Sequence, residues 1–267
     1  MGHFSVFHNI GVHRIRIFRI LAVMKALLLL LVLAIASAGA QPAAKPPARI
    51  SAIAVPAGFA RIAYAKDSFS EYLRALPLKA DREIRSFNGS PVQNSIYAVL
   101  AVLDMPLLFK ADLEQCADFC MRLWAEWHKA SGRLRELSLF NFSGTRVRYS
   151  TSGLSERNFL RRAFAYSNSH SLKKGCAAVD EKDLRPGDMI VQNERGGIGH
   201  VSMIMDACES PKGERLYLIG FGFMPAQEFH LERADARNGR DGWYTIEGFS
   251  RYLSENLNVG KPVLRRL

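Results

Sequence analysis

Residues 184–206 read LRPGDMIVQNERGGIGHVSMIMD, and this stretch predicts a pair of antiparallel strands. A Pro-Gly-Asp turn precedes a short apolar run at 189–193, and a glycine-containing loop ends just before a second apolar run at 200–207. The same kind of run predicts further strands at 215–223 and 227–232. We therefore expect the C-terminal part of the chain to form an antiparallel sheet.

The strongest helix signal lies before these strands, at residues 111–130, which read ADLEQCADFCMRLWAEWHKA. Asp112, followed three residues later by Gln115, has the spacing of a capping box, which places Cys116 in the first turn of the helix. Other helices are predicted at 68–78, 155–168 and 245–257. Other strands are predicted at 50–64, at 95–105 as a central strand, and at 134–142. Helices that precede an antiparallel sheet predict an α+β fold.

The N-terminal sequence is typical of a secretory signal. Met24-Lys25 is followed by the apolar run ALLLLLVLAIASAGA, which ends in small residues, so we expect cleavage after Ala40 and export of the protein to the periplasm or cell envelope. The alternative is an uncleaved N-terminal anchor. Translation starts either at Met1 or at Met24. The expected organisation is a leader and signal peptide at 1–40, a Pro/Ala tether at 41–49 and a single domain at 50–267.

The charge and the motifs restrict the partners. The chain of 267 residues carries a formal charge of +11, of which +7 remains after the expected cleavage, and this favours anionic surroundings such as wall polymer or a lipid surface. Export argues against nucleic acid as a partner. Neither of the common glycine-rich nucleotide-binding motifs is present, so no nucleotide site is expected. The four cysteines leave open whether the protein forms disulfides or keeps its thiols.

Two residues have positions suited to nucleophilic chemistry. Backbone N–H groups at the start of a helix favour the thiolate form of Cys116, which is the nucleophile in amide cleavage by cysteine. His200 begins a strand, where a general base can meet such a nucleophile. The alternatives are that Cys116 is an ordinary buried core residue and that His200 is a hydrogen-bonded structural histidine.

A third group would have to orient the imidazole. Gln227 and His230, in the segment after the next strand, are both able to do so, although a turn followed by an edge strand is the alternative interpretation. Cys116, Cys120, His200 and His230 also form a conceivable zinc set, but two cysteines four residues apart on one helix have poor zinc spacing. We therefore expect neither a metal nor another cofactor.

Five ordered blocks resemble those of the DUF4846 family of uncharacterised bacterial envelope proteins. They cover roughly residues 50–255 and read QCADFCMRLWAEW, FNFSGTRVRYSTSG, FAYSNSHSL, LRPGDMIVQNERGGIGHVSMIMD and FGFMPAQEFHLE. The blocks are in turn remotely similar to papain-like cell-wall cysteine peptidases and CHAP amidases. Those enzymes carry a cysteine at a helix start, a PGD turn, a Gly-His pair that opens a strand, and a polar orienting residue.

This second resemblance implies a papain-like arrangement, in which a cysteine-bearing helix packs on an antiparallel sheet. It implies that Cys116 is the nucleophile, His200 the base, and Gln227 or His230 the third member. The backbone N–H of Cys116 and the side chain of Gln115 would then hold the oxyanion. The implied function is a cysteine amidase or peptidase that acts on murein peptide. The alternative is a binding or scaffold protein that recognises another envelope component without turnover.

Overall fold

A computed structural model describes residues 46–93 and 96–267. The expected leader and signal peptide, and most of the tether, lie outside these residues. The described residues belong to one compact unit, Pro46–Leu267. None of the helices in this unit is both long and apolar enough to cross a membrane.

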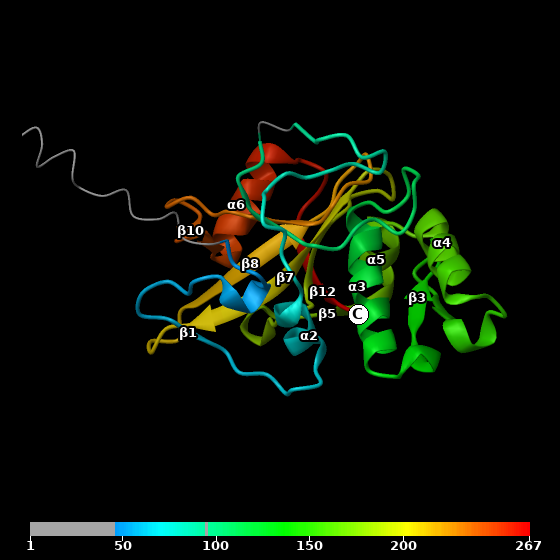
Figure 1. The fold of residues 1–267 in the computed structure, drawn as a ribbon, viewed down its shortest axis with the longest axis horizontal. Coiled ribbons are helices and arrows are strands. Elements are labelled where there is room, and N and C mark those ends of the chain that lie inside the picture. The colour runs from blue at the N-terminus through cyan, green and yellow to red at the C-terminus, as the bar shows by residue number, and fades with distance from the viewer. Residues whose placement is uncertain (1–45, 94–95) are drawn as a thin grey trace, which may run out of the picture. The chain divides into compact units, whose positions relative to one another are not determined.

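The centre of the unit is an antiparallel sheet, as the apolar runs predict (Figure 1). Its path is β10-β11-β8-β7-β6-β12-β5, while β1 pairs with β7, and β9 joins β2 to β8. The strands of this sheet are β1 Ala60–Arg61, β2 Val99–Val102, β5 Ala177–Ala178, β6 Met189–Gln192, β7 His200–Glu209, β8 Arg215–Phe221, β9 His230–Glu232, β10 Gly239–Arg240, β11 Trp243–Tyr244 and β12 Val263–Arg266. The longest of them, β7, lies at the middle of the sheet.

The described residues also form five α-helices, which together with the sheet confirm the predicted α+β class. They are α2 Phe69–Ala75, α3 Cys116–Ala130, α4 Glu156–Tyr166, α5 Ser169–Gly175 and α6 Ile246–Asn256. Single-turn 3-10 helices occur at η1 Ile50–Ala52, η2 Leu134–Glu136, η3 Tyr149–Thr151 and η4 Glu181–Asp183. The predicted helices at 68–78, 155–168 and 245–257 are confirmed, and each begins after a Ser or Thr whose side chain caps it.

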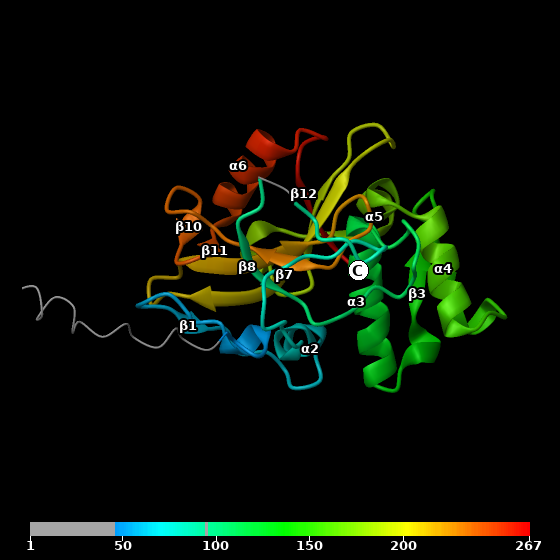
Figure 2. The ribbon, with the colours of Figure 1, turned by 45° about the horizontal axis from the view of Figure 1, so that its top comes forward.

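Two hydrophobic clusters cover the two faces of the sheet, because side chains alternate along each strand. Val201 and Met203 of β7 join the cluster that contains Phe119 and Cys120 of α3. Ile204 joins the other cluster, which contains Phe249 and Leu253 of α6. Figures 1 and 2 both show α3 and α6 on either side of β7 and β8.

A buried ion-pair network fixes the N-terminal elements to β7. Asp206 accepts hydrogen bonds from Arg61 at 2.7 Å and from two nitrogens of Arg74 at 2.7 and 2.9 Å. Arg61 lies on β1 and Arg74 on α2, while the Asp206 side chain is fully buried. The three residues therefore join three elements that are far apart in the sequence.

The predicted strands at 95–105 and 134–142 are confirmed only in part. The apolar run at 95–105 forms only the short strand β2, whose sole strand partner among the described residues is β9, so it is peripheral rather than central. The segment 134–142 forms η2 and then β3, Ser138–Phe140, which pairs with β4, Arg146–Arg148, in a separate two-stranded sheet. Neither α5 nor β12 was predicted, because α5 is polar and short and β12 ends in two arginines.

Candidate functional site

Cys116 is the first residue of α3. The N-cap is Gln115, whose side chain accepts the N–H of Asp118 while the Asp118 carboxylate accepts the N–H of Gln115. The predicted capping box therefore lies three residues too early. Asp112 instead accepts one bond from the Gln115 amide at 2.9 Å and another from the N–H of Ala226 at 2.7 Å.

The Cys116 sulfur lies among backbone N–H groups. Those of Val201, and of Ala117 and Cys116 at the helix start, each lower the pKa of the thiol. The N–H of Ile204 donates to Asp188 and its carbonyl accepts from Gly187, so the backbone groups of Ile204 point toward β6. Backbone groups of successive strand residues point alternately to the two neighbouring strands, so the N–H of Val201 points toward β8.

These N–H groups do not make Cys116 acidic. Burial raises the pKa of its thiol from 9.0 to about 11 and outweighs the N–H groups, which lower it; the nearby Asp118 raises it further. Asp118 is itself buried, and burial raises the pKa of its carboxyl group well above its ordinary value. The thiol is therefore protonated near neutral pH, in contrast to the thiolate that the helix start was expected to favour.

His200 is the first residue of β7. Its side chain is 1% exposed, and its ring packs edge-on against Phe221 with centroids 4.9 Å apart. Nε2 lies 3.0 Å from the hydroxyl oxygen of Ser202, while Nδ1 has no hydrogen-bond partner among the residues described. Burial and the nearby His230 lower the pKa of His200 to about 3, so the imidazole is neutral.

The fold thus brings two residues that are 84 positions apart to the same end of β7. The N–H of Val201, the residue directly after His200, lies close enough to the Cys116 sulfur to lower the pKa of the thiol. His200 lies beside Phe221 and Leu253 on the side of the sheet that α6 covers, whereas Cys116 belongs to α3, and neither ring nitrogen of His200 bonds the sulfur in the described structure. The two pKa values differ by about 8, so moving the proton from thiol to imidazole costs on the order of 10 kcal/mol before the charges attract each other.

The other predicted site residues surround this pair without bonding to His200. Gln227 donates to the hydroxyl of Tyr97 at 3.2 Å. Nε2 of His230 lies 3.2 Å from the carboxylate of Glu232, and its ring packs on the side of Phe221 at a centroid distance of 4.5 Å. The Gln115 amide nitrogen is bound to Asp112, as described above. The expectation that Gln227 or His230 orients His200 therefore stays a prediction.

Ser202 provides the hydrogen bond to the imidazole of His200, and it was not among the predicted site residues. The signal was available, because residues 200 and 202 of a strand share one face. A serine two residues after a histidine in an apolar strand has few other buried partners. Its hydroxyl is the polar group that holds Nε2 of His200 in this structure.

The segment that follows β8 covers the pair. The ring of Phe223 lies 5.5 Å from that of His200, and a side chain at Gly222 would touch Gln115 and Phe119 of α3. The N–H of Ala226 is fixed to Asp112, whereas Met224 and Pro225 between them are exposed. The cavity beside His200 measures about 20 Å³, which holds a single water molecule and no substrate.

The four cysteines are all free thiols in the structure. Within residues 46–93 and 96–267, no group of three or more His, Cys, Asp and Glu side chains is arranged to hold a metal ion. The site itself presents a thiol, an imidazole and backbone N–H groups.

Comparison with known proteins yields one family. No curated protein and no solved structure matches the sequence. The model of a domain of unknown function, DUF4846, matches residues 50–154 and 152–258, which together span nearly the whole described unit and include both Cys116 and His200. The chain is therefore a member of the DUF4846 family.

Proposed function

We propose that this protein is an exported cysteine hydrolase that cleaves amide bonds in cell-wall peptide, with Cys116 as nucleophile and His200 as base. The observation that carries the proposal is that the N–H of Val201, the neighbour of His200, lies close enough to the Cys116 sulfur to lower the pKa of its thiol. The signal-like sequence that ends at Ala40 supports export and hence an encounter with murein.

The chemistry follows from the groups present. The Cys116 thiol gives its proton to His200 as the sulfur attacks the amide carbonyl. The C–N bond then breaks, and the leaving amine takes the proton from the imidazole. Water attacks the resulting thioester, His200 accepts a proton from that water and returns it to the departing sulfur. The backbone N–H groups at the start of α3 stabilise the oxyanion of each tetrahedral intermediate.

Nδ1 of His200 is suited to receive the thiol proton. It is a buried nitrogen without a partner among the described residues, whereas Nε2 is held by Ser202. A buried polar atom without a hydrogen bond costs free energy, so such atoms are rare and a role in proton transfer would explain this one. Proton transfer requires the ring to turn toward the β8 side, where the sulfur lies, and requires the segment after β8 to move so that substrate can enter.

Turnover of purified wall fragments tests the proposal. Wild-type protein, Cys116→Ala and Cys120→Ala are incubated with murein peptides, and the products are identified by mass spectrometry. Cys120 is a matched control because it lies one turn later on α3 and is also buried. We expect cleavage by wild type and Cys120→Ala and none by Cys116→Ala. Equal cleavage by all three variants would show that Cys116 is not the nucleophile.

A second function, binding or scaffolding without turnover, is favoured by the neutral state of the pair. A protonated thiol and an unprotonated imidazole, both buried, are suited to packing rather than to catalysis. This alternative predicts that wall fragments bind without being cleaved and that Cys116→Ala retains full affinity. Equilibrium binding of the same fragments, measured beside the cleavage assay, separates the two functions.

A further inference from the structure

Residues 133–175, here called the cationic segment, carry the positive charge of the described unit. They contain nine Lys and Arg against two Glu, a formal charge of +7. The remaining residues of 46–267 contain 22 Lys and Arg against 23 Asp and Glu, a formal charge of −1. The segment forms η2, β3, β4, η3, α4 and α5, and Figures 1 and 2 show β3, α4 and α5 together on the side of α3 away from α6.

The charge of the segment is not neutralised within the unit. Nine of the other 22 Lys and Arg residues form ion pairs, whereas no Lys or Arg of the cationic segment does so within the described residues. Arg146 illustrates the difference, because it stacks on Phe140 and donates to the hydroxyl of Ser138, which leaves its charge unmatched. An anionic partner outside the chain would supply the missing charges.

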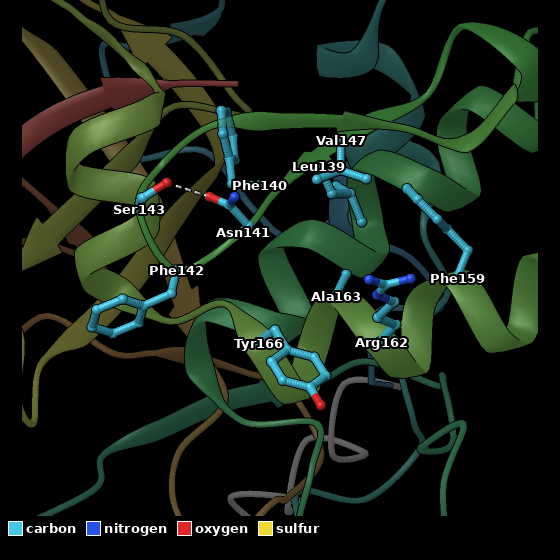
Figure 3. A pocket seen from close by; sticks show the side chains of 10 residues that line it. All are labelled: Leu139, Phe140, Asn141, Phe142, Ser143, Val147, Phe159, Arg162, Ala163 and Tyr166. Atoms are coloured by element: carbon cyan, nitrogen blue, oxygen red, sulfur yellow. Dashed lines mark hydrogen bonds between the residues drawn. The ribbon is translucent and has the colours of Figure 1, made fainter. Parts of the chain in front are cut away.

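An apolar pocket of about 670 Å³ opens in the same segment, between the β3–β4 hairpin and α4 (Figure 3). Phe159, Arg162, Ala163 and Tyr166 line it from α4, at the spacing of a single helix face. Figure 3 shows Phe142 and Tyr166 on the side of the pocket opposite Leu139 and Val147.

The rim of this pocket exposes apolar groups to solvent. The exposed fractions are 54% for Phe142, 66% for Tyr166 and 38% for Val147. Val147 lies between Arg146 and Arg148 on β4, a strand whose three residues are all exposed. Large exposed apolar side chains gathered at one place mark an interaction surface.

We propose that the cationic segment docks on an anionic lipid bilayer, with Phe142 and Tyr166 at the level of the headgroups and the pocket open to acyl chains. Aromatic side chains beside Lys and Arg are typical of surfaces that lie in a membrane interface. A hydrated polyanion such as a wall polymer would match the charge but would leave the exposed aromatic rings and the apolar pocket in water. The proposal does not depend on the hydrolase activity.

Quenching of tryptophan by brominated lipid tests the proposal on the full chain. Phe142→Trp places a reporter on the rim, and Ser254→Trp places one on the exposed side of α6 as a control. Each is mixed with vesicles of 70% phosphatidylcholine and 30% dibrominated phosphatidylglycerol, and the wild-type emission is subtracted. We expect at least twofold quenching for Phe142→Trp and none for Ser254→Trp. Association of the protein with vesicles through the N-terminal segment alone would not produce this contrast between the two positions.

Charge variants complete the test. Arg146→Gln, Arg148→Gln and Arg162→Gln, combined in the Phe142→Trp background, should abolish the quenching. The same number of exposed cations removed elsewhere, at Arg82, Lys212 and Lys261, should leave it within about 20% of its original value. Absence of quenching at position 142, equal quenching at both reporters, or equal quenching by uncharged vesicles would overturn the proposal. Binding of poly-glutamate by the segment without quenching by lipid would assign the surface to an acidic polymer instead.

Discussion

Alkylation of Cys116 as a function of pH reports directly on the resting state of the candidate site. The pKa of this thiol is raised to about 11 from an ordinary value of 9.0, because burial disfavours the thiolate. At pH 8, about one thiol in a thousand is then ionised, against about one in ten for an ordinary thiol. Since the thiolate is the reacting form, we expect alkylation about a hundredfold slower than that of the unfolded chain.

The pH profile and the order of reaction make this prediction specific. The rate at Cys116 should rise about tenfold for each pH unit between 8 and 10, without a plateau. Burial raises the pKa of Cys176 and of Cys208 to about 12, so Cys116 should react first among these three residues. The assay is timed iodoacetamide labelling, acid quenching and peptide mapping by mass spectrometry, with the chain unfolded in guanidinium as reference.

Two results would refute this reasoning. A plateau in the rate below pH 8 would show a thiolate stabilised by a charged partner, which the neutral His200 does not provide. Equal rates at all four cysteines would show that labelling occurs only after the whole unit unfolds, so that the rate says nothing about the local pKa.

Four further predictions concern the surroundings of the site. Ser202→Ala removes the hydroxyl group that is bonded to Nε2 of His200. We expect it to lower the free energy of unfolding by about 1 kcal/mol and any cleavage rate at least tenfold. Unchanged cleavage would show that this hydrogen bond does not position the ring. Asp206→Asn leaves Arg61 and Arg74 without their buried partner and should lower the free energy of unfolding, measured with denaturant, by about 3–5 kcal/mol. The control Asp81→Asn, at an exposed ion pair, should lower it by less than about 0.5 kcal/mol. Gly199→Ala would place a Cβ 2.3 Å from the hydroxyl oxygen of Ser169 and 2.4 Å from the carbonyl oxygen of Gln192, and should cost about 1–3 kcal/mol; full stability would contradict this close packing. The pKa of His200 falls from 6.5 to about 3 on folding, so the unfolded chain binds the proton first as pH is lowered. The free energy of unfolding should therefore fall between pH 6.5 and pH 3, by up to about 1.4 kcal/mol per pH unit. His200→Gln should show a shallower decline over the same range.

The strands and helices with strong local signals were predictable. The antiparallel pair around His200 and the helices with Ser or Thr caps follow from alternation and from capping, which act within a few residues. The position of the 95–105 run was not predictable in this way, because a central and a peripheral strand can have the same apolar composition. What decides the difference is that β7 takes both β6 and β8 as partners, and this is a property of the whole sheet.

The helix start near Cys116 and the strand start at His200 were predictable from the sequence, but the electrostatics of these two residues were not. The sequence placed Cys116 at a helix start and His200 at a strand start, and the fold brings these two ends together. Desolvation depends on what covers a group, and the segment that lies against Gln115 and Phe119 begins at Gly222, more than 100 residues after Cys116 in the sequence. The position of Cys116 at a helix start predicted a lowered pKa for its thiol, whereas burial raises that pKa.

The most direct test of the hydrolase proposal is a search for the acyl-enzyme. Wild-type protein is mixed with murein peptides, quenched in acid within the first turnovers and digested, and the peptide that contains Cys116 is weighed. We predict a thioester adduct on Cys116 with the mass of the acyl part of the substrate, absent from Cys116→Ala and retained in Cys120→Ala. Cleavage products without an adduct at Cys116, or an unmodified thiol with intact substrate after prolonged incubation, would contradict the account.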